Sequence, residues 1–271
     1  MSIRLVAVDV DGTLLNGNKE LTSAVAEAID EVKQRGILFT IATGRDISGL
    51  RRFRGLLSPE VPVITYNGAE LRRAGSEELI SACCLPKETA LEVIGRGLDQ
   101  GFSVIVWSRG ELFIGQAGPF SCGYSEMYGI REKKLTAYEH LAERGVTKVI
   151  WAGEAEKIAA LEKALSDSPI RGSGCCTSDV CYLEFMAAGV DKGSGLKAAA
   201  ELLGLGRGEV MAVGDGHNDL PMLRWAGLAV AMGNASPAVK AEAAAVTKSC
   251  EEEGLALALR RLLADGYGAN P

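Results

Sequence analysis

Residues 3–14 read Ile-Arg-Leu-Val-Ala-Val-Asp-Val-Asp-Gly-Thr-Leu, and the architecture of the chain can be worked out from this segment. Ile3–Val10 is an apolar run, as expected for a strand that is buried on both faces. Asp9 and Asp11 lie at its end, and Gly12 then permits a sharp turn. In an extended backbone both carboxylates point the same way, so they repel each other and favour a bound cation or a shared proton. A turn with Asx-type hydrogen bonding is the alternative interpretation.

Strands and helices alternate on both sides of this segment. The further strands expected are Ile37–Thr43, Val61–Tyr66, Glu209–Gly214 and Leu228–Met232. The helices expected are one capped by Thr22 or Ser23 and ended by Gly36, then Asp46–Leu57, Gly193–Leu203, Asp219–Trp225, Ala238–Ala245 and Gly254–Ala264. This rhythm predicts an α/β fold with a Rossmann-like, doubly wound parallel-sheet core.

The middle of the chain has a different pattern. Shorter strands with alternating polarity are expected at Ser103–Trp107, Leu112–Gly115, Thr147–Trp151 and Cys181–Phe185, and helices at Glu88–Gln100 and Glu154–Ser166. We therefore expect two domains. Residues 1–82 and 188–271 would form the core, and residues 83–187 would form an inserted α+β cap domain.

Composition excludes several classes of protein. The 271 residues carry a net charge of −6, which argues against a nucleic-acid surface. The apolar run at the N-terminus is too short for a signal peptide or a membrane span, so we expect a cytoplasmic protein without a membrane partner. The spacing of the seven cysteines does not match a metal site. We therefore expect them to be small, buried apolar side chains of a protein in a reducing compartment.

Three further segments carry polar residues that could act together with Asp9 and Asp11. They are Ala42-Thr43-Gly44-Arg45, Gly189-Val190-Asp191-Lys192-Gly193 and Gly214-Asp215-Gly216-His217-Asn218-Asp219. We place all of them at the carboxyl ends of core strands, where open α/β sheets bind ligands. The segment with Thr43 suits a phosphate cradle or a helix cap. The lysine of the segment 189–193 could neutralise a phosphate or be a solvated surface residue. The last adds carboxylates that suit Mg²⁺, and His217 is interpreted as a rim residue.

The order of these four segments resembles the haloacid dehalogenase superfamily of phosphohydrolases. Asp9-x-Asp11-Gly12-Thr13 is similar to its first motif, Thr43 to the second, Lys192 to the third, and Gly214-Asp215-x-x-Asn218-Asp219 to the fourth. The long insertion resembles the large α/β cap of the Cof-type, sugar-phosphatase-like branch. Tyr66-Asn67-Gly68-Ala69 and Val230-Ala231-Met232-Gly233-Asn234-Ala235 are also similar to that branch.

This resemblance implies a Mg²⁺-dependent phosphatase that forms an aspartyl phosphate on Asp9. The implied catalytic residues are Asp9, Asp11, Thr43 and Lys192. The implied phosphate-binding residues are Asp11, Gly12, Thr43, Gly44, Lys192 and Asn218. The implied metal-site residues are Asp9, Asp11 through its carbonyl, Asp215 and Asp219, the last as a neighbouring support together with Asn218.

Two alternatives stay open at this point. A phosphomutase of the same superfamily shares the aspartate pair. A phosphoaspartyl receiver, or another metal- or phosphate-binding protein without activity, also combines acidic residues with a threonine and a lysine; receivers, however, are much shorter. The substrate is a small-molecule phosphomonoester in the preferred interpretation, and the sequence indicates neither its identity nor the oligomeric state.

Overall fold

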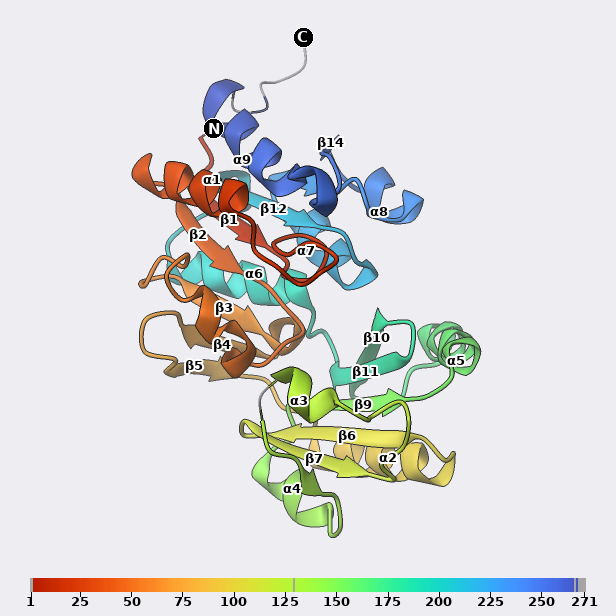
Figure 1. Ribbon diagram of the computed structural model, residues 1–271. Coiled ribbons are helices and arrows are strands. Elements are labelled where there is room, and N and C mark those ends of the chain that lie inside the picture. Colours follow the sequence, from red (N-terminus) through yellow and green to blue (C-terminus); the bar gives the residue numbers. More distant parts are fainter. Residues whose placement is uncertain (1, 129, 266, 268–271) are drawn as a thin grey trace. The chain divides into compact units, whose positions relative to one another are not determined.

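The computed structural model describes residues 2–128, 130–265 and 267. Its contacts divide the chain into two compact units (Figure 1). The first unit comprises residues 1–43, 52–80 and 191–271, and the second comprises residues 44–51 and 81–190. Among the described residues, no helix combines the length and the apolar character needed to cross a bilayer.

The first unit is built on a five-stranded parallel sheet. In spatial order its strands are β14 (Ala245–Val246), β13 (Leu228–Ala231), β12 (Val210–Gly214), β1 (Leu5–Val8) and β2 (Leu38–Ile41). All four residues of β1 are buried, because β12 and β2 flank the strand and helices cover the sheet. This arrangement confirms the α/β prediction and the predicted burial of the N-terminal strand.

Helices cover both faces of this sheet (Figure 1). On one face, α6 (Lys192–Leu202) and α7 (Leu220–Trp225) pack with the inward side chains of β1 and β12 in a single apolar cluster. On the other, α1 (Ser23–Gln34) packs against α9 (Gly254–Asp265). The hydroxyl of Thr22 accepts a hydrogen bond from the Val25 amide at 3.3 Å, so Thr22 is the cap of α1.

Two predicted helices of the chain are wrong. Asp46–Leu57 contains a 3-10 helix at Ile47–Phe53, because the Asp46 carboxylate accepts hydrogen bonds from the Ser48 hydroxyl and the Gly49 amide and so competes with helical bonding. Ala238–Ala245 divides into α8 (Pro237–Ala241) and strand β14. Here the pairing of β14 with β13 outweighs the high helix propensity of the alanines.

A smaller antiparallel sheet follows β2 along the chain. It consists of β3 (Pro62–Thr65), β4 (Glu70–Arg73) and β5 (Leu79–Ala82), of which only β3 was predicted. A short 3-10 helix, Tyr66–Gly68, joins β3 to β4, with Tyr66 and Asn67 at positive φ. An isolated bridge from Ala42 to Ile64 connects this segment to the end of β2.

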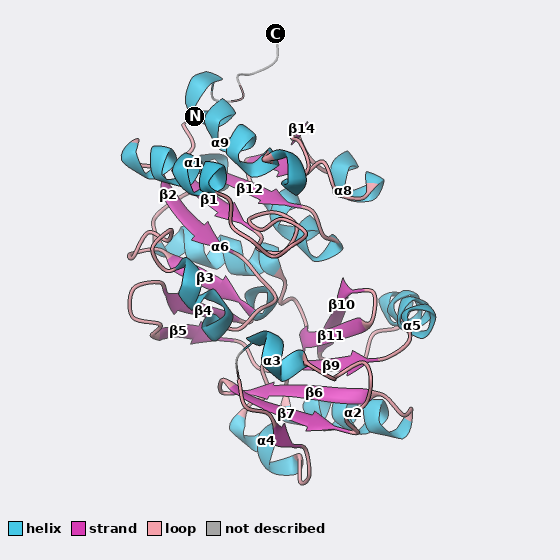
Figure 2. Ribbon diagram, in the orientation of Figure 1, coloured by secondary structure: helices cyan, strands magenta, loops and turns pink. Residues whose placement is uncertain are grey.

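The second unit contains a six-stranded mixed sheet (Figure 2). Its strands, in spatial order, are β10 (Ser173–Asp179), β11 (Tyr182–Ala187), β9 (Lys148–Ala152), β6 (Ser103–Ser108), β7 (Glu111–Gly115) and β8 (Lys133–Lys134). Its helices are α2 (Lys87–Asp99), α3 (Tyr124–Tyr128), α4 (Glu139–Arg144) and α5 (Ala155–Asp167). Side chains of α2, α4 and α5 form one apolar cluster with β6, β9 and β11. Sequence reasoning missed β10, whose composition is polar.

The expectation of buried cysteines is wrong. Cys83, Cys84 and Cys122 are exposed, and the other four cysteines are partly exposed. All seven are free thiols.

The loop after β3 generates the first testable prediction. Gly68 has φ +97°, and a Cβ atom there would lie 2.1 Å from the Asp191 carbonyl oxygen. Gly68→Ala should lower the melting temperature by about 5 °C or more, because it combines a strained φ with a backbone clash. Gly36→Ala is the matched control, since Gly36 has φ +76° but no atom within 4 Å of its Cβ position. Equal losses in thermal unfolding of the two variants would contradict the close approach at Gly68.

Candidate active site

Asp9 is positioned by the end of β1 and by the turn that follows it. Its amide donates to the Val213 carbonyl at 3.0 Å, and its carbonyl accepts from the Leu14 amide at 3.2 Å. Gly12, at φ +80°, lies inside this turn, where a Cβ atom would be 2.4 Å from a carboxylate oxygen of Asp215. The turn can therefore approach Asp215 only because residue 12 has no side chain.

Asp215 follows β12 and is held from two sides. The Thr13 hydroxyl donates to Oδ1 at 2.8 Å, and the Asn234 amide donates to Oδ2 at 3.1 Å. Asn234 also donates to the Gly12 carbonyl at 2.9 Å, so it ties the first and fourth motifs together. Neither Thr13 nor Asn234 was assigned a role from the sequence, although both lie in segments singled out there.

Lys192 is the first residue of α6, and its ammonium lies between two carboxylates. It donates to Oδ1 of Asp9 and to Oδ1 of Asp219, each at 2.6 Å, and its side chain is fully buried. Its predicted place at the end of a core strand is wrong. The preceding strand, β11, belongs to the sheet of the second unit, and Lys192 instead follows the helix cap Asp191.

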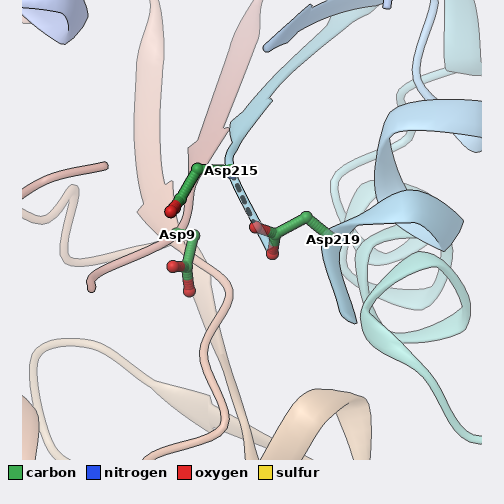
Figure 3. Close-up of side chains that lie close together, drawn as sticks. All are labelled: Asp9, Asp215 and Asp219. Carbon is green, nitrogen blue, oxygen red and sulfur yellow. Dashed lines mark hydrogen bonds between the residues drawn. The ribbon is translucent and has the colours of Figure 1, made fainter. Parts of the chain in front are cut away.

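Asp219 is also fully buried and is fixed by the backbone. Its Oδ2 accepts from the amides of Asp215, at 2.9 Å, and Gly216, at 2.8 Å. Figure 3 shows Asp9, Asp215 and Asp219 gathered at the ends of their elements, with the bond from Asp215 to Asp219 dashed. The loop can close this tightly because residue 214 is a glycine. A Cβ atom there would lie 2.6 Å from the Asp219 carboxyl group.

These three carboxylates form a group that could hold a metal ion. One oxygen from each lies within 4.8 Å of the other two. Three hard, negatively charged oxygen donors suit Mg²⁺, so the residues present fit that ion. Of the four predicted metal-site residues, the side chain of Asp11 lies outside this group. It is partly exposed, and its Oδ1 accepts from Nζ of Lys19 at 2.8 Å.

Burial and crowding perturb the acidic side chains. Loss of solvent raises the pKa of Asp9 from 3.8 to about 8, with Lys192 opposing this shift and Asp219 and Asp215 adding to it. Burial and the Asp219 charge raise the pKa of Asp215 to about 6. For Lys192, burial lowers the pKa, but Asp219 and Asp9 together outweigh it, so the pKa is raised and the ammonium persists.

Two of the remaining predicted residues, Thr43 and Asn218, are joined through a third residue. Thr43 is buried after β2. Its amide donates to the Ile64 carbonyl at 2.9 Å, and its carbonyl accepts from the Asn67 amide at 2.8 Å. The Asn218 side chain donates to that of Asn67 at 3.1 Å, so Asn67 connects Thr43 with Asn218.

Gly44 belongs to the second unit, where its carbonyl accepts a hydrogen bond from Nζ of Lys148 at 2.7 Å. His217 is exposed, with Nε2 3.4 Å from the Ser236 hydroxyl oxygen.

The chain belongs to the haloacid dehalogenase-like hydrolase family, whose sequence model matches residues 6–259. It is 31% identical over 239 residues to the HMP-PP phosphatase of Klebsiella pneumoniae, covering 88% of this chain and 87% of that one. Among solved structures, a haloacid dehalogenase-like hydrolase from Bacteroides thetaiotaomicron has a TM-score of 0.83 and 28% identity, covering 96% of this chain and all of that one.

A structure of BT1666 from the same bacterium, analysed among phosphatases of this superfamily, also has a TM-score of 0.83 and 28% identity. That match covers 98% of this chain and 96% of BT1666. The predicted family is confirmed, and the chain is an enzyme, a phosphatase. This outcome decides against the receiver and the other non-catalytic interpretations.

The raised pKa of Asp9 predicts how stability depends on pH. In metal-free protein the folded state keeps a proton on Asp9 that the unfolded chain releases, so stability should fall as pH rises from about 4 to about 8. Bound Mg²⁺ should favour the ionised carboxylate and oppose this fall. The rise in melting temperature on adding Mg²⁺ to chelator-treated protein should therefore be larger at pH 8 than at pH 6.

Asp9→Asn is the control for this measurement, because it removes the titrating group. Its melting temperature in chelator should depend less on pH between 6 and 8 than that of the wild type. A Mg²⁺-induced rise that is the same at both pH values in the wild type would contradict the predicted linkage.

Proposed function

We propose that this enzyme hydrolyses a small-molecule phosphomonoester in two steps, with Asp9 as the nucleophile and Mg²⁺ as the cofactor. The observation that carries this proposal is the buried Lys192 ammonium bonded to Asp9 and Asp219, with Asp215 close by. Among the described residues of this cluster, one lysine faces three carboxylates, so a divalent cation would complete the balance of charge.

In the first step a carboxylate oxygen of Asp9 attacks phosphorus. The bond from phosphorus to the leaving oxygen breaks, and its electron pair stays on that oxygen, so an aspartyl phosphate is left on the protein. A carboxylate that approaches a phosphate dianion meets repulsion, which the Lys192 ammonium offsets. Mg²⁺ bound by the Asp9 and Asp215 carboxylates and the Asp11 carbonyl, with Asp219 alongside, would supply further positive charge to the phosphoryl oxygens.

Asp11 is the proposed general acid and base. It would protonate the leaving oxygen in the first step and then, as a carboxylate, take a proton from the water that hydrolyses the aspartyl phosphate. The same group serves both steps because the first leaves it in the protonation state that the second requires. Its side chain, two residues after Asp9, lies outside the group of carboxylates that could hold the metal, which supports this separate role.

Four other residues are proposed to hold the phosphoryl oxygens. They are Gly12 and Gly44 through their amides, the Thr43 hydroxyl, and the Asn218 side chain. The hydrogen-bonded connection from Thr43 through Asn67 to Asn218 supports the inclusion of the last two. Precise positioning accounts for much of phosphoryl-transfer catalysis, so such a connected network has a direct use.

Residues 83–187 are proposed as a cap that selects the leaving group. Two polar side chains of β11 in this segment have partners within the second unit. Glu184 accepts from Nζ of Lys148 at 3.0 Å and from the Ser178 hydroxyl at 2.7 Å, and the Tyr182 hydroxyl donates to the Phe120 carbonyl at 3.1 Å. The substrate class therefore has to be found with a panel of phosphomonoesters, assayed with and without Mg²⁺.

Substitution of the two motif aspartates should separate their roles. Asp9→Asn should abolish turnover of every substrate in the panel, because an amide is a poor nucleophile. Asp11→Asn should lower turnover of a sugar phosphate by about 10²- to 10⁴-fold. With an aryl phosphate, whose leaving group needs little protonation, Asp11→Asn should release a burst of up to one phenol per enzyme and then slow down.

Stopped-flow absorbance measures this burst, and chelator-treated enzyme gives the background. A burst from Asp9→Asn, or wild-type turnover of a sugar phosphate by Asp11→Asn, would show that these roles are wrongly assigned.

A further inference from the structure

The loop after the first motif carries a lysine that contacts the proposed acid and base. Lys19 is ten residues after Asp9, and its Nζ lies 2.8 Å from Oδ1 of Asp11. The lysine side chain is 59% exposed and the aspartate side chain 37% exposed. An ion pair as exposed as this one contributes little to stability, so stability does not explain its presence.

The backbone of this loop is fixed in an unusual conformation at Lys19. Its φ is +62°, a left-handed value that is unfavourable for a residue with a Cβ atom. The Asn16 side chain accepts from the amides of Asn18 and Glu20, and the Asn16 carbonyl accepts from the Lys19 amide at 2.9 Å. These bonds form a tight turn that maintains the strained residue.

Two contacts from outside anchor the same turn. Glu251 accepts from the Gly17 amide at 2.6 Å, and the Arg52 guanidinium donates to the Lys19 carbonyl at 3.4 Å. The turn is therefore tied to two segments distant in sequence. A strained residue that is held from several sides and directs its charge onto Asp11 is more consistent with a functional constraint than with an incidental surface contact.

We propose that Lys19 is a positioning residue for Asp11. By binding one carboxylate oxygen, the ammonium restricts rotation of the Asp11 side chain and so orients it for proton transfer. This inference rests on the proposed role of Asp11 as acid and base. It adds that the loop of residues 16–20 contributes to the rate through Lys19, although Lys19 belongs to none of the four motifs.

The test is a double-mutant cycle with Lys19→Met and Asp11→Asn, assayed on an alkyl phosphate that the wild type hydrolyses. Lys19→Met should lower kcat by about 3- to 10-fold with little change in KM, because the group it orients acts in the proton transfer. In the Asp11→Asn background the same substitution should have no further effect. Lys19→Arg should restore most of the rate.

Two controls separate positioning from structure. Lys197→Met removes a lysine of similar exposure, 58%, which pairs with Glu201 away from the motifs, and it should leave kcat unchanged. Lys19→Gly relieves the strained φ, so it should not lower the melting temperature yet should lose the same rate as Lys19→Met.

The possible outcomes are distinct. A wild-type kcat in Lys19→Met, with Asp11→Asn impaired, would overturn the Lys19 proposal alone. An equal loss from Lys19→Met in both backgrounds would overturn it as well, because the lysine would then act independently of Asp11. If Asp11→Asn itself kept the wild-type rate, the proposed acid and base role would fail, and the positioning role with it.

Discussion

A buried ammonium group shared by two carboxylates is the interaction on which the rest of this site depends. Lys192 bonds to Asp9 and Asp219 at 2.6 Å each, and the two aspartates come from segments more than 200 residues apart in the sequence. Three buried or partly buried carboxylates in one place are unfavourable without such a partner. The parallel sheet makes the arrangement possible, because β1 and β12 are neighbours that end at the same edge.

Close backbone approach is the second requirement. Gly12, Gly193 and Gly214 each lie where a Cβ atom would fall within 2.6 Å of a neighbouring atom, in Asp215, Pro221 and Asp219 respectively. These contacts bring the first, third and fourth motifs close enough for the carboxylates and the lysine to meet. The same crowding removes solvent from Asp9 and raises its pKa, so ionisation of the proposed nucleophile depends on the positive charge placed beside it.

The sequence predicted the parts of this structure that depend on local pattern. Apolar runs identified β1 and β12, and the capping hydroxyl of Thr22 marked the start of α1. It could not reveal features set by pairing between strands or by contacts between folded segments. Strand β14 exists through pairing with β13, the polar strand β10 through pairing with β11, and the contact of Lys19 with Asp11 through a strained turn. The position of Lys192 on a helix after the inserted segment is of the same kind.

The claim at the centre of this account is that Asp9 becomes phosphorylated during turnover. The direct measurement is to quench wild-type enzyme with acid during turnover of an aryl phosphate and to reduce the protein with borohydride, which converts an acyl phosphate on aspartate into homoserine. Peptide mass spectrometry should then find homoserine at position 9, and only in samples that received substrate. Homoserine at another aspartate, or none in an enzyme shown to be turning over, would contradict the account.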